Sequence, residues 1–144
     1  MRSHASPEGW DAALTAFLQL HRLSKAGKAR FMDERMEAFF RDATRGLAAA
    51  GWARLWFLDC DGTAVASFLC LETLGSAGGS VGLYNSGFDP EHAKLAPGIV
   101  LLAHIIRDAI DRGVLVFDFL RGEESYKYAF GPVPQDLFRV RVAP

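Results

Sequence analysis

Acidic, basic and phenolic side chains gather in one short stretch, FDFLRGEESYKYAFG, which spans residues 117–131. Asp118 follows an apolar run, and burial there would raise the pKa of its carboxyl group towards the working range of a base. Lys127 stands between Tyr126 and Tyr128, so a cation lies beside two phenols. Acyl transfer to an amine needs a base for the amine, a cation near the carbonyl oxygen and an acid for the leaving group. The stretch therefore suits an acyl-transfer site.

A structural interpretation of the same stretch stays open. Asp118 would then pair with Arg121 or Lys127, the lysine would be solvated, and each tyrosine would be a packing residue. Arg121, Glu123 and Glu124 would either bind an acceptor or belong to an ordinary charged loop.

Two amphipathic helices are expected at the start of the chain. Ser6 and Pro7 are typical of a helix start, and the apolar face that follows comprises Trp10, Leu14, Phe17, Leu18 and His21. The basic segment 25–30 is expected to be a linker. Asp33 would cap a second helix that ends at Gly51. Its apolar face would be Met36, Phe39, Phe40, Ala43 and Leu47.

Three strands are expected next, in an antiparallel meander. The first two cover residues 54–60 and 63–74, joined by the two-residue turn Asp61-Gly62. A Gly/Ser loop over 75–80 leads to the third strand, over 81–87.

The second half of the chain changes the topology. Pro97 begins the clearest helix, which ends at Gly113, and a nearly continuous apolar strand follows over 114–120. Strand, helix and strand in this order favour a right-handed crossover, so the strands around Leu83 and Phe117 should be parallel. A short helix over 123–130 and an alternating strand over 137–142 close the chain.

The order of elements predicts an α/β (α+β) fold, a mixed and mostly antiparallel sheet flanked by helices. The length of 144 residues suits one domain. Residues 1–30 would form its N-terminal helix and linker, and residues 31–144 its core.

Composition narrows the classes of function. The formal net charge of -1 gives no electrostatic basis for binding nucleic acid in bulk. No apolar run approaches the roughly 20 residues that a membrane-spanning helix needs. Cys60 and Cys70 lie in apolar contexts and are expected to be free thiols in a reducing compartment, hence a cytoplasmic protein. No two histidines have the spacing of metal ligands on one helix, so no metal is expected.

Three blocks of the sequence carry a family resemblance. They are the hairpin at 54–74, the segment YNSGFDPEHAKLAPGIVLLAHIIRDAI at 84–110, and the stretch at 117–131. Together they resemble the GNAT-type acetyltransferase domain of CelD/BioF2-like proteins, which is similar to the Fem-type aminoacyl transferases. The resemblance spans roughly residues 18–142. It implies a GNAT-like fold and direct transfer of an acyl group, with acetyl-CoA as co-substrate, to a small-molecule or sugar amine in exopolysaccharide or cell-envelope metabolism.

The resemblance also assigns roles to residues. The fourth and fifth strands of GNAT folds splay apart around the acyl thioester, which implies backbone contacts from Leu83, Asn85 and Ser86, and places Tyr84 near the reacting carbonyl. The helix that follows holds the pyrophosphate at its N-terminus, where free N–H groups and the helix dipole favour an anion. The implied phosphate contacts are Lys94, Pro97, Gly98, Ile99 and Val100.

The aromatic-Lys-x-x-Phe-Gly motif of the Fem-type relatives matches residues 126–131. It implies that Lys127 stabilises the transferred acyl group. Tyr126 or Tyr128 would protonate the departing thiolate, and Tyr128 would also contact the cofactor.

Two other hypotheses remain. A Fem-like enzyme would take aminoacyl-tRNA, which the near-neutral charge disfavours. In the CelD/BioF2-like family the domain usually forms the second of two GNAT-like halves, so this chain would instead be a non-catalytic half that packs against a second half or a second copy of itself. The incomplete glycine signature, with Val100 where a small residue is expected, favours this last hypothesis.

Overall fold

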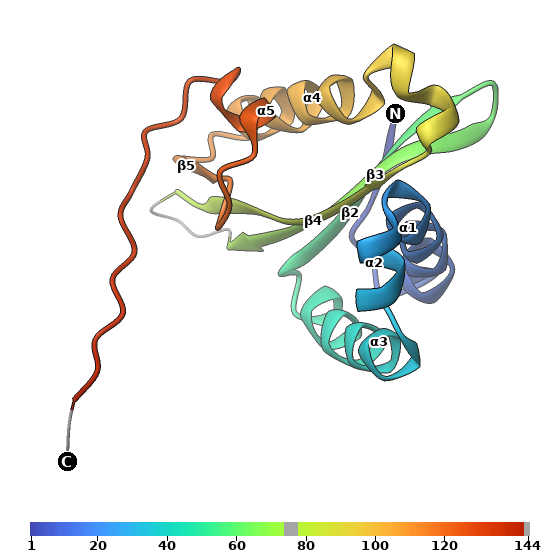
Figure 1. Ribbon diagram of the computed structural model, residues 1–144, viewed down its shortest axis with the longest axis horizontal. Helices are drawn as coiled ribbons and strands as arrows, with labels where there is room; N and C mark the ends of the chain where they lie inside the picture. Colours follow the sequence, from blue (N-terminus) through green and yellow to red (C-terminus); the bar gives the residue numbers. More distant parts are fainter. Residues whose placement is uncertain (74–77, 143–144) are drawn as a thin grey trace.

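The computed structural model describes residues 1–73 and 78–142, which form a five-stranded sheet between two layers of helices (Figure 1). The strands are β1 (Arg2–His4), β2 (Ala53–Cys60), β3 (Thr63–Thr73), β4 (Ser80–Phe88) and β5 (Val116–Asp118). The helices are α1 (Trp10–Ser24), α2 (Ala26–Phe31), α3 (Glu34–Ala49), α4 (Pro97–Asp111), α5 (Ser125–Tyr128) and the 3-10 helix η1 (Pro90–Leu95). The predicted class, a mixed sheet flanked by helices, is confirmed.

The sheet follows the order of the strands in the chain, from β1 to β5. Neighbouring strands are antiparallel except β4 and β5, which pair in parallel from Ser80 opposite Val116 to Gly82 opposite Asp118. The predicted parallel pair is thus confirmed. The predicted two-residue turn is confirmed too, since Asp61 and Gly62 both have positive φ, 49° and 81°, as a type I′ turn requires.

Alternation along β2 and β3 divides the core between the two faces of the sheet. Leu55, Phe57 and Leu69 pack under α1 and α3. Trp56, Phe68 and Cys70 point the other way, where α4 covers them. In Figure 1, α1, α2 and α3 lie on one side of the sheet and α4 and α5 on the other.

The predicted apolar face of α1 is confirmed, because its residues Trp10, Leu14, Phe17, Leu18 and His21 are all buried. The helix begins later than predicted, however. Ser6 accepts a hydrogen bond from the N–H of Glu8, and Gly9, with a φ of 73°, forms the cap. Asp33 caps α3 as predicted, with its Oδ1 accepting from the N–H of Met36 at 2.8 Å.

Gly87 allows α1 to lie directly against β4. A Cβ at this position would stand 2.3 Å from the backbone nitrogen of His21. At the same contact, Ser24 Oγ accepts from the Phe88 N–H at 2.8 Å and donates to the Leu20 carbonyl at 2.9 Å. The close approach fixes the end of α1, and with it the start of α2, beside the edge of β4.

Several sequence predictions are wrong. The segment 25–30, expected as a linker, is the helix α2. The strand expected over 114–120 shortens to β5, where Val116 and Asp118 are exposed rather than buried. The strand expected over 137–142 does not form. Residues 131–142 run away from the body as an extended tail (Figure 1).

The N-terminal strand and the loop before β4 also differ from what the sequence predicted. The strand β1, which pairs with β2, had no sequence signal, and the expected Gly/Ser loop lies partly outside the described residues, which resume at Gly78. Within the described part of the chain, no helix combines the length and the apolar character needed to cross a membrane.

Candidate functional site

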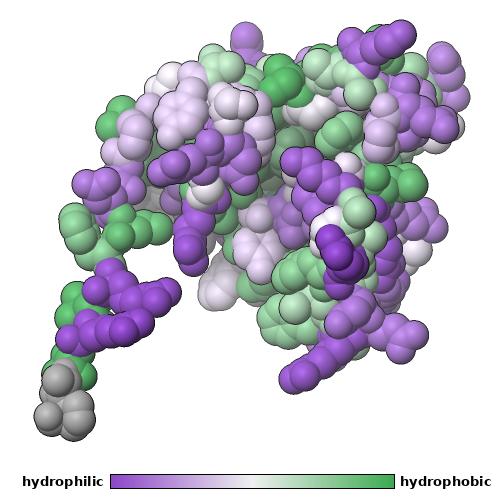
Figure 2. Space-filling view, in the orientation of Figure 1, coloured by the Kyte–Doolittle hydropathy of each residue, from purple (hydrophilic) through white to green (hydrophobic). Residues whose placement is uncertain are grey.

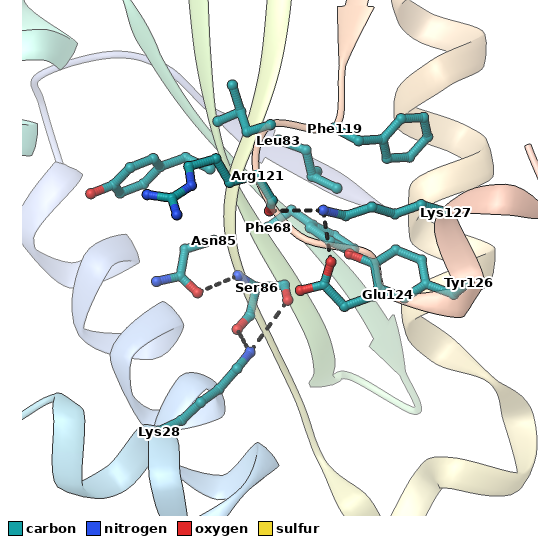
Figure 3. Close-up of a pocket in the computed structure, with 12 residues that line it drawn as sticks. Lys28, Phe68, Leu83, Asn85, Ser86, Phe119, Arg121, Glu124, Tyr126 and Lys127 are labelled. Atoms are coloured by element: carbon teal, nitrogen blue, oxygen red, sulfur yellow. Dashed lines mark hydrogen bonds and ion pairs between the residues drawn. The ribbon is translucent and has the colours of Figure 1, made fainter. Parts of the chain in front are cut away.

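The candidate site is a cavity that opens where β4 and β5 part. Their pairing ends at Gly82 and Asp118, and from Leu83 onwards β4 faces a cavity of about 420 Å³ instead of a strand (Figure 3). The far wall comes from the segment after β5 and from α5. The lining residues are Lys28, Phe68, Leu83, Tyr84, Asn85, Ser86, Phe119, Leu120, Arg121, Glu124, Tyr126 and Lys127.

A β-bulge lies in the middle of the β4 wall. Leu69 stands opposite Asn85 and Cys70 opposite Leu83, so Tyr84 has no partner on β3. An extra residue of this kind bends a strand and redirects its side chains. Tyr84 is 46% exposed and its ring lies 6.0 Å from that of Phe40 in α3.

Beyond the bulge, the backbone of β4 has an open edge. Asp89 donates its N–H to the Val65 carbonyl of β3, and in an antiparallel ladder the direction alternates, so the groups of Phe88 and Ser86 point away from β3. Side chains satisfy these groups in place of a neighbouring strand. Asn85 Oδ1 accepts from the Ser86 N–H at 2.8 Å, and Lys28 Nζ donates to the Ser86 carbonyl at 2.5 Å (Figure 3).

Lys28 is the functional candidate that sequence reasoning missed. Its amine also lies 3.4 Å from Ser86 Oγ. Burial lowers the pKa of Lys28 most, the neighbouring Lys25 lowers it further, and the Glu124 carboxylate opposes the shift. No local signal in the sequence indicates this role, because Lys25 has an extended backbone that separates α1 from α2, and Lys28 reaches β4 only through the fold.

His21 lies beneath this edge and is 1% exposed. Burial first, and then the Lys28 cation, lower its pKa to about 4, while the Asn85 amide opposes the shift. Its Nδ1 is buried and has no hydrogen-bond partner among the described residues. The ring is therefore neutral near pH 7.

Lys127 on the opposite wall is also buried, at 6% exposure, and is not the solvated lysine of the structural interpretation. Its Nζ donates to the carbonyls of Arg121 at 3.0 Å and Gly122 at 3.2 Å, and lies 2.8 Å from Glu124 Oε2. These contacts hold the turn before α5 in place. The hydrogen bond from Lys127 lowers the pKa of Glu124, which keeps that carboxylate charged.

Tyr126 completes this wall and packs against the core on the α4 side of the sheet. Burial, and secondarily the Glu124 charge, raise the pKa of its phenol, so it stays protonated at neutral pH. The predicted residues Leu83, Tyr84, Asn85, Ser86, Tyr126 and Lys127 thus meet around one cavity.

Asp118 and Tyr128 are not in the cavity lining. The expected burial of Asp118 is wrong, because β5 lies at the edge of the sheet and leaves this side chain exposed. Its Oδ1 accepts from the N–H of Leu120 at 2.7 Å and so shapes the turn after the strand. Tyr128 is 53% exposed.

The start of α4, expected to hold phosphates, is open but offers few donors. Ala96 adopts a φ of 46°, and its carbonyl accepts from the N–H groups of Ile99 and Val100 at 2.9 and 3.1 Å. Pro97 has no N–H. A Cβ on Gly98 would meet nothing within 4 Å, and Lys94 nearby is exposed.

Metal ligands are not gathered in the described parts of the chain, where no group of three His, Cys, Asp or Glu could hold an ion. Cys60 and Cys70 are free thiols, Cys70 fully buried and Cys60 only partly.

Comparisons with known proteins give a consistent result. The sequence matches the acetyltransferase (GNAT) domain family over residues 2–128. Among solved structures, an aminoglycoside acetyltransferase from an uncultured soil metagenomic sample, in complex with sisomicin, is 9% identical with a TM-score of 0.66, over 99% of this chain and 94% of that one. A GCN5-related N-acetyltransferase from Ralstonia eutropha JMP134 is 18% identical, with a TM-score of 0.64, over 99% and 97%.

A third solved structure, the aminoglycoside 6'-N-acetyltransferase AAC(6')-IG from Acinetobacter haemolyticus, is 15% identical with a TM-score of 0.63, over 100% of this chain and 99% of that one. At sequence identities this low, the similarity to these three structures shows a shared fold and nothing more. A search of curated proteins returned no match.

Proposed function

The chain belongs to the GNAT acetyltransferase family, and from this premise we propose that it is an N-acyltransferase that uses acetyl-CoA and acts directly on an amine. The observation that carries the proposal is the open edge of β4. The N–H and carbonyl of Ser86 face the cavity and are satisfied only by the side chains of Asn85 and Lys28 among the described residues. A linear molecule with amide groups, such as the pantetheine arm of CoA, can replace these side chains as a strand would.

Acetyl-CoA would supply an activated acyl thioester at this edge. We assign the start of α4 to its phosphates, with Gly98 offering a backbone N–H in open space and Lys94 a nearby charge. Leu83 and Tyr84 would line the acyl end of the cavity, next to the bulge.

The opposite wall provides the proton chemistry. Tyr126 stays protonated because its pKa is raised, so it can donate a proton to the departing sulfur. Glu124 stays charged, and its 55% exposed side chain suits it to hold the ammonium group of an acceptor. We assign Lys127 a positioning role, because its ammonium already contacts three acceptors around the turn that carries Glu124.

We propose a small-molecule or sugar amine as the acceptor. Two structural relatives are aminoglycoside acetyltransferases, so amino sugars are the first acceptors to test. The three sequence blocks at 54–74, 84–110 and 117–131 lead us to propose further that the chain lies in the CelD/BioF2-like branch, with a cytoplasmic role in cell-envelope or exopolysaccharide metabolism.

We also propose that residues 1–144 form one domain that pairs with a second copy of itself. In the tail, Val133, Leu137, Phe138, Val140 and Val142 are each at least 76% exposed, and Figure 2 shows their hydrophobic surface standing clear of the body. The alternating segment 137–142 is suited to add a strand to the free edge of β5 in the other copy. Sedimentation should show a dimer that Phe138→Asp converts to a monomer; a wild-type monomer would contradict this.

The function is tested by calorimetric titration with acetyl-CoA. Gly98→Glu places a negative charge where the phosphates would bind, while Gly98→Ala adds only a methyl group in open space and is the matched control. We expect micromolar binding by the wild type and the alanine variant, and at least about a tenfold loss in the glutamate variant. Release of CoA thiol in the presence of amino sugars then measures transfer. A well-folded chain that does not bind acetyl-CoA would refute the proposal.

A further inference from the structure

Two primary amines face the cavity, and they differ in their surroundings. Lys127 Nζ contacts three acceptors, which match the three protons of an ammonium group. Lys28 Nζ contacts the carbonyl and the hydroxyl of a single residue, Ser86, with the hydroxyl at 3.4 Å. Of the two amines, Lys28 is therefore the one with fewer acceptors around it in the described structure.

Lys28 also makes the hydrogen bond to β4 that a bound acyl donor would have to displace. Its amine occupies the Ser86 carbonyl on the open edge of β4, and Figure 3 shows it pointing from α2 into the space between Asn85 and Glu124. An amide group that takes over this carbonyl releases the Lys28 amine inside the cavity, on a flexible four-carbon stem. The released amine and the acyl group then share a space of about 420 Å³.

We propose that Lys28 is a self-acylation site, at which the chain transfers the acyl group of its own bound acyl-CoA to the Lys28 side chain. The inference rests on the proposed function, since it needs acyl-CoA in this cavity. Lys28 acts as an acceptor that competes with the external amine.

The chemistry balances without a further reactant. Neutral Lys28 Nζ attacks the thioester carbonyl carbon, a C–N bond forms and the C–S bond breaks. The sulfur leaves with the electron pair and takes up a proton, giving CoA thiol, while Nζ loses a proton and becomes an amide nitrogen. Burial already favours the neutral form of this amine by lowering its pKa. Holding the two groups in one cavity raises their effective concentration.

Acylation changes the cavity. The amide nitrogen keeps one N–H, so the Ser86 carbonyl can still be satisfied, but the positive charge is lost and an acyl group fills space beside Tyr126 and Glu124. The modified chain is expected to bind acyl-CoA more weakly, and saturation with an external amine acceptor should protect Lys28.

The test is peptide mass spectrometry of the full chain after incubation with acetyl-CoA, with binding measured by calorimetry on the same preparation. Lys25, exposed and one turn away, is the internal comparator for uncatalysed acetylation. We expect Lys28 to be modified at least about tenfold faster than Lys25, because Lys28 lines the cavity proposed for the donor and Lys25 does not. The rate at Lys28 should saturate with acetyl-CoA, whereas the rate at Lys25 should rise linearly.

Two variants complete the experiment. Lys28→Arg keeps a cation for the Ser86 carbonyl but cannot be acylated by this route, so the fast modification should vanish with the melting temperature little changed. Lys25→Arg should leave the modification of Lys28 unaltered. If acetyl-CoA binds and Lys28 is modified no faster than Lys25, the self-acylation is refuted while the acyltransferase proposal stands. If acetyl-CoA does not bind, both are refuted.

Discussion

The contact between Gly87 and α1 allows a quantitative prediction for Gly87→Ala. An added Cβ would lie 2.3 Å from His21 N, 2.5 Å from Leu20 C and 2.7 Å from His21 Cα. All three are backbone atoms, so no side-chain rotation relieves the clash. The whole end of α1 must move away from β4.

The required movement sets the size of the effect. An ordinary contact would need about 1 Å more separation, and a gap of that size forfeits about a quarter to a half of the dispersion attraction across it. The bonds of Ser24 to Phe88 would be stretched as well. We expect a loss of about 3 kcal/mol in the free energy of unfolding, at the upper end for an overpacked core. For a chain of this size that lowers the melting temperature by about 6–12 °C.

Thermal and urea unfolding, followed by circular dichroism, measure this loss. The matched control is Gly46→Ala in α3, where a Cβ meets nothing within 4 Å. Alanine favours a helix interior, so this control should gain about 0.5–1 kcal/mol. A Gly87→Ala protein that melts within about 2 °C of the wild type would refute the argument that this contact positions α1.

Three other predictions concern polar groups that are buried or half-buried. The folded-state pKa of His21, about 4, lies below its ordinary 6.5, so the unfolded chain binds the extra proton and stability should fall by about 3 kcal/mol as the pH drops from 6.5 to 4; His21→Gln should flatten this part of the unfolding profile, and an unchanged profile would contradict the assignment. Glu72, 2% exposed and bonded to Arg54 and Arg112, should cost about 3 kcal/mol in urea unfolding when replaced by alanine, at the lower end for a broken buried ion pair, since both guanidinium groups lose this carboxylate while Arg112 keeps Asp108. Tyr126→Phe keeps the ring but removes the proton donor, so kcat should fall about 100-fold with the affinity for acetyl-CoA unchanged; an unchanged kcat would exclude Tyr126 as the acid.

Periodicity in the sequence predicted those elements that bury one long face. The helix from Pro97 and the hairpin at Asp61-Gly62 followed from local sequence pattern. The parallel pairing of β4 and β5 followed from the order strand, helix, strand along the chain. The short elements were not predicted, because they form only through contacts with other parts of the chain. The helix α2 has only six residues, too few for a stable helix in isolation, and it is held by the bond from Lys28 to Ser86.

The same dependence explains the errors in the second half of the chain. Residues 137–142 alternate as a strand does, but a strand also needs a neighbour, and the described tail has none within the chain. Asp118 was expected to be buried because apolar residues surround it in the sequence. At a sheet edge, that pattern no longer implies cover on both faces.

The candidate site could be predicted only in part, because its shape depends on register. Tyr126 and Lys127 were identifiable by chemical type, whereas Tyr84 was suggested only by the family resemblance. The bulge at Tyr84 and the direction of the Ser86 backbone groups follow from pairing with β3, which a single sequence does not state. The number of acceptors around Lys127 likewise needed the structure.

The hydrogen bonds from side chains to the backbone of β4 explain how the sheet can keep an open edge in a folded protein. A buried N–H or carbonyl without a partner costs about 1–3 kcal/mol, so the Ser86 groups need partners even when no ligand is bound. Asn85 and Lys28 provide them as side chains; the Asn85 bond contributes about 1 kcal/mol net and the bond from the Lys28 ammonium about 1.5–3 kcal/mol. A ligand amide that takes their place supplies replacement bonds and leaves the rest of β4 paired with β3. A neighbouring strand in the same position would have to lose its whole ladder of backbone hydrogen bonds before a substrate could bind. Side chains therefore suit an edge that must open for a substrate.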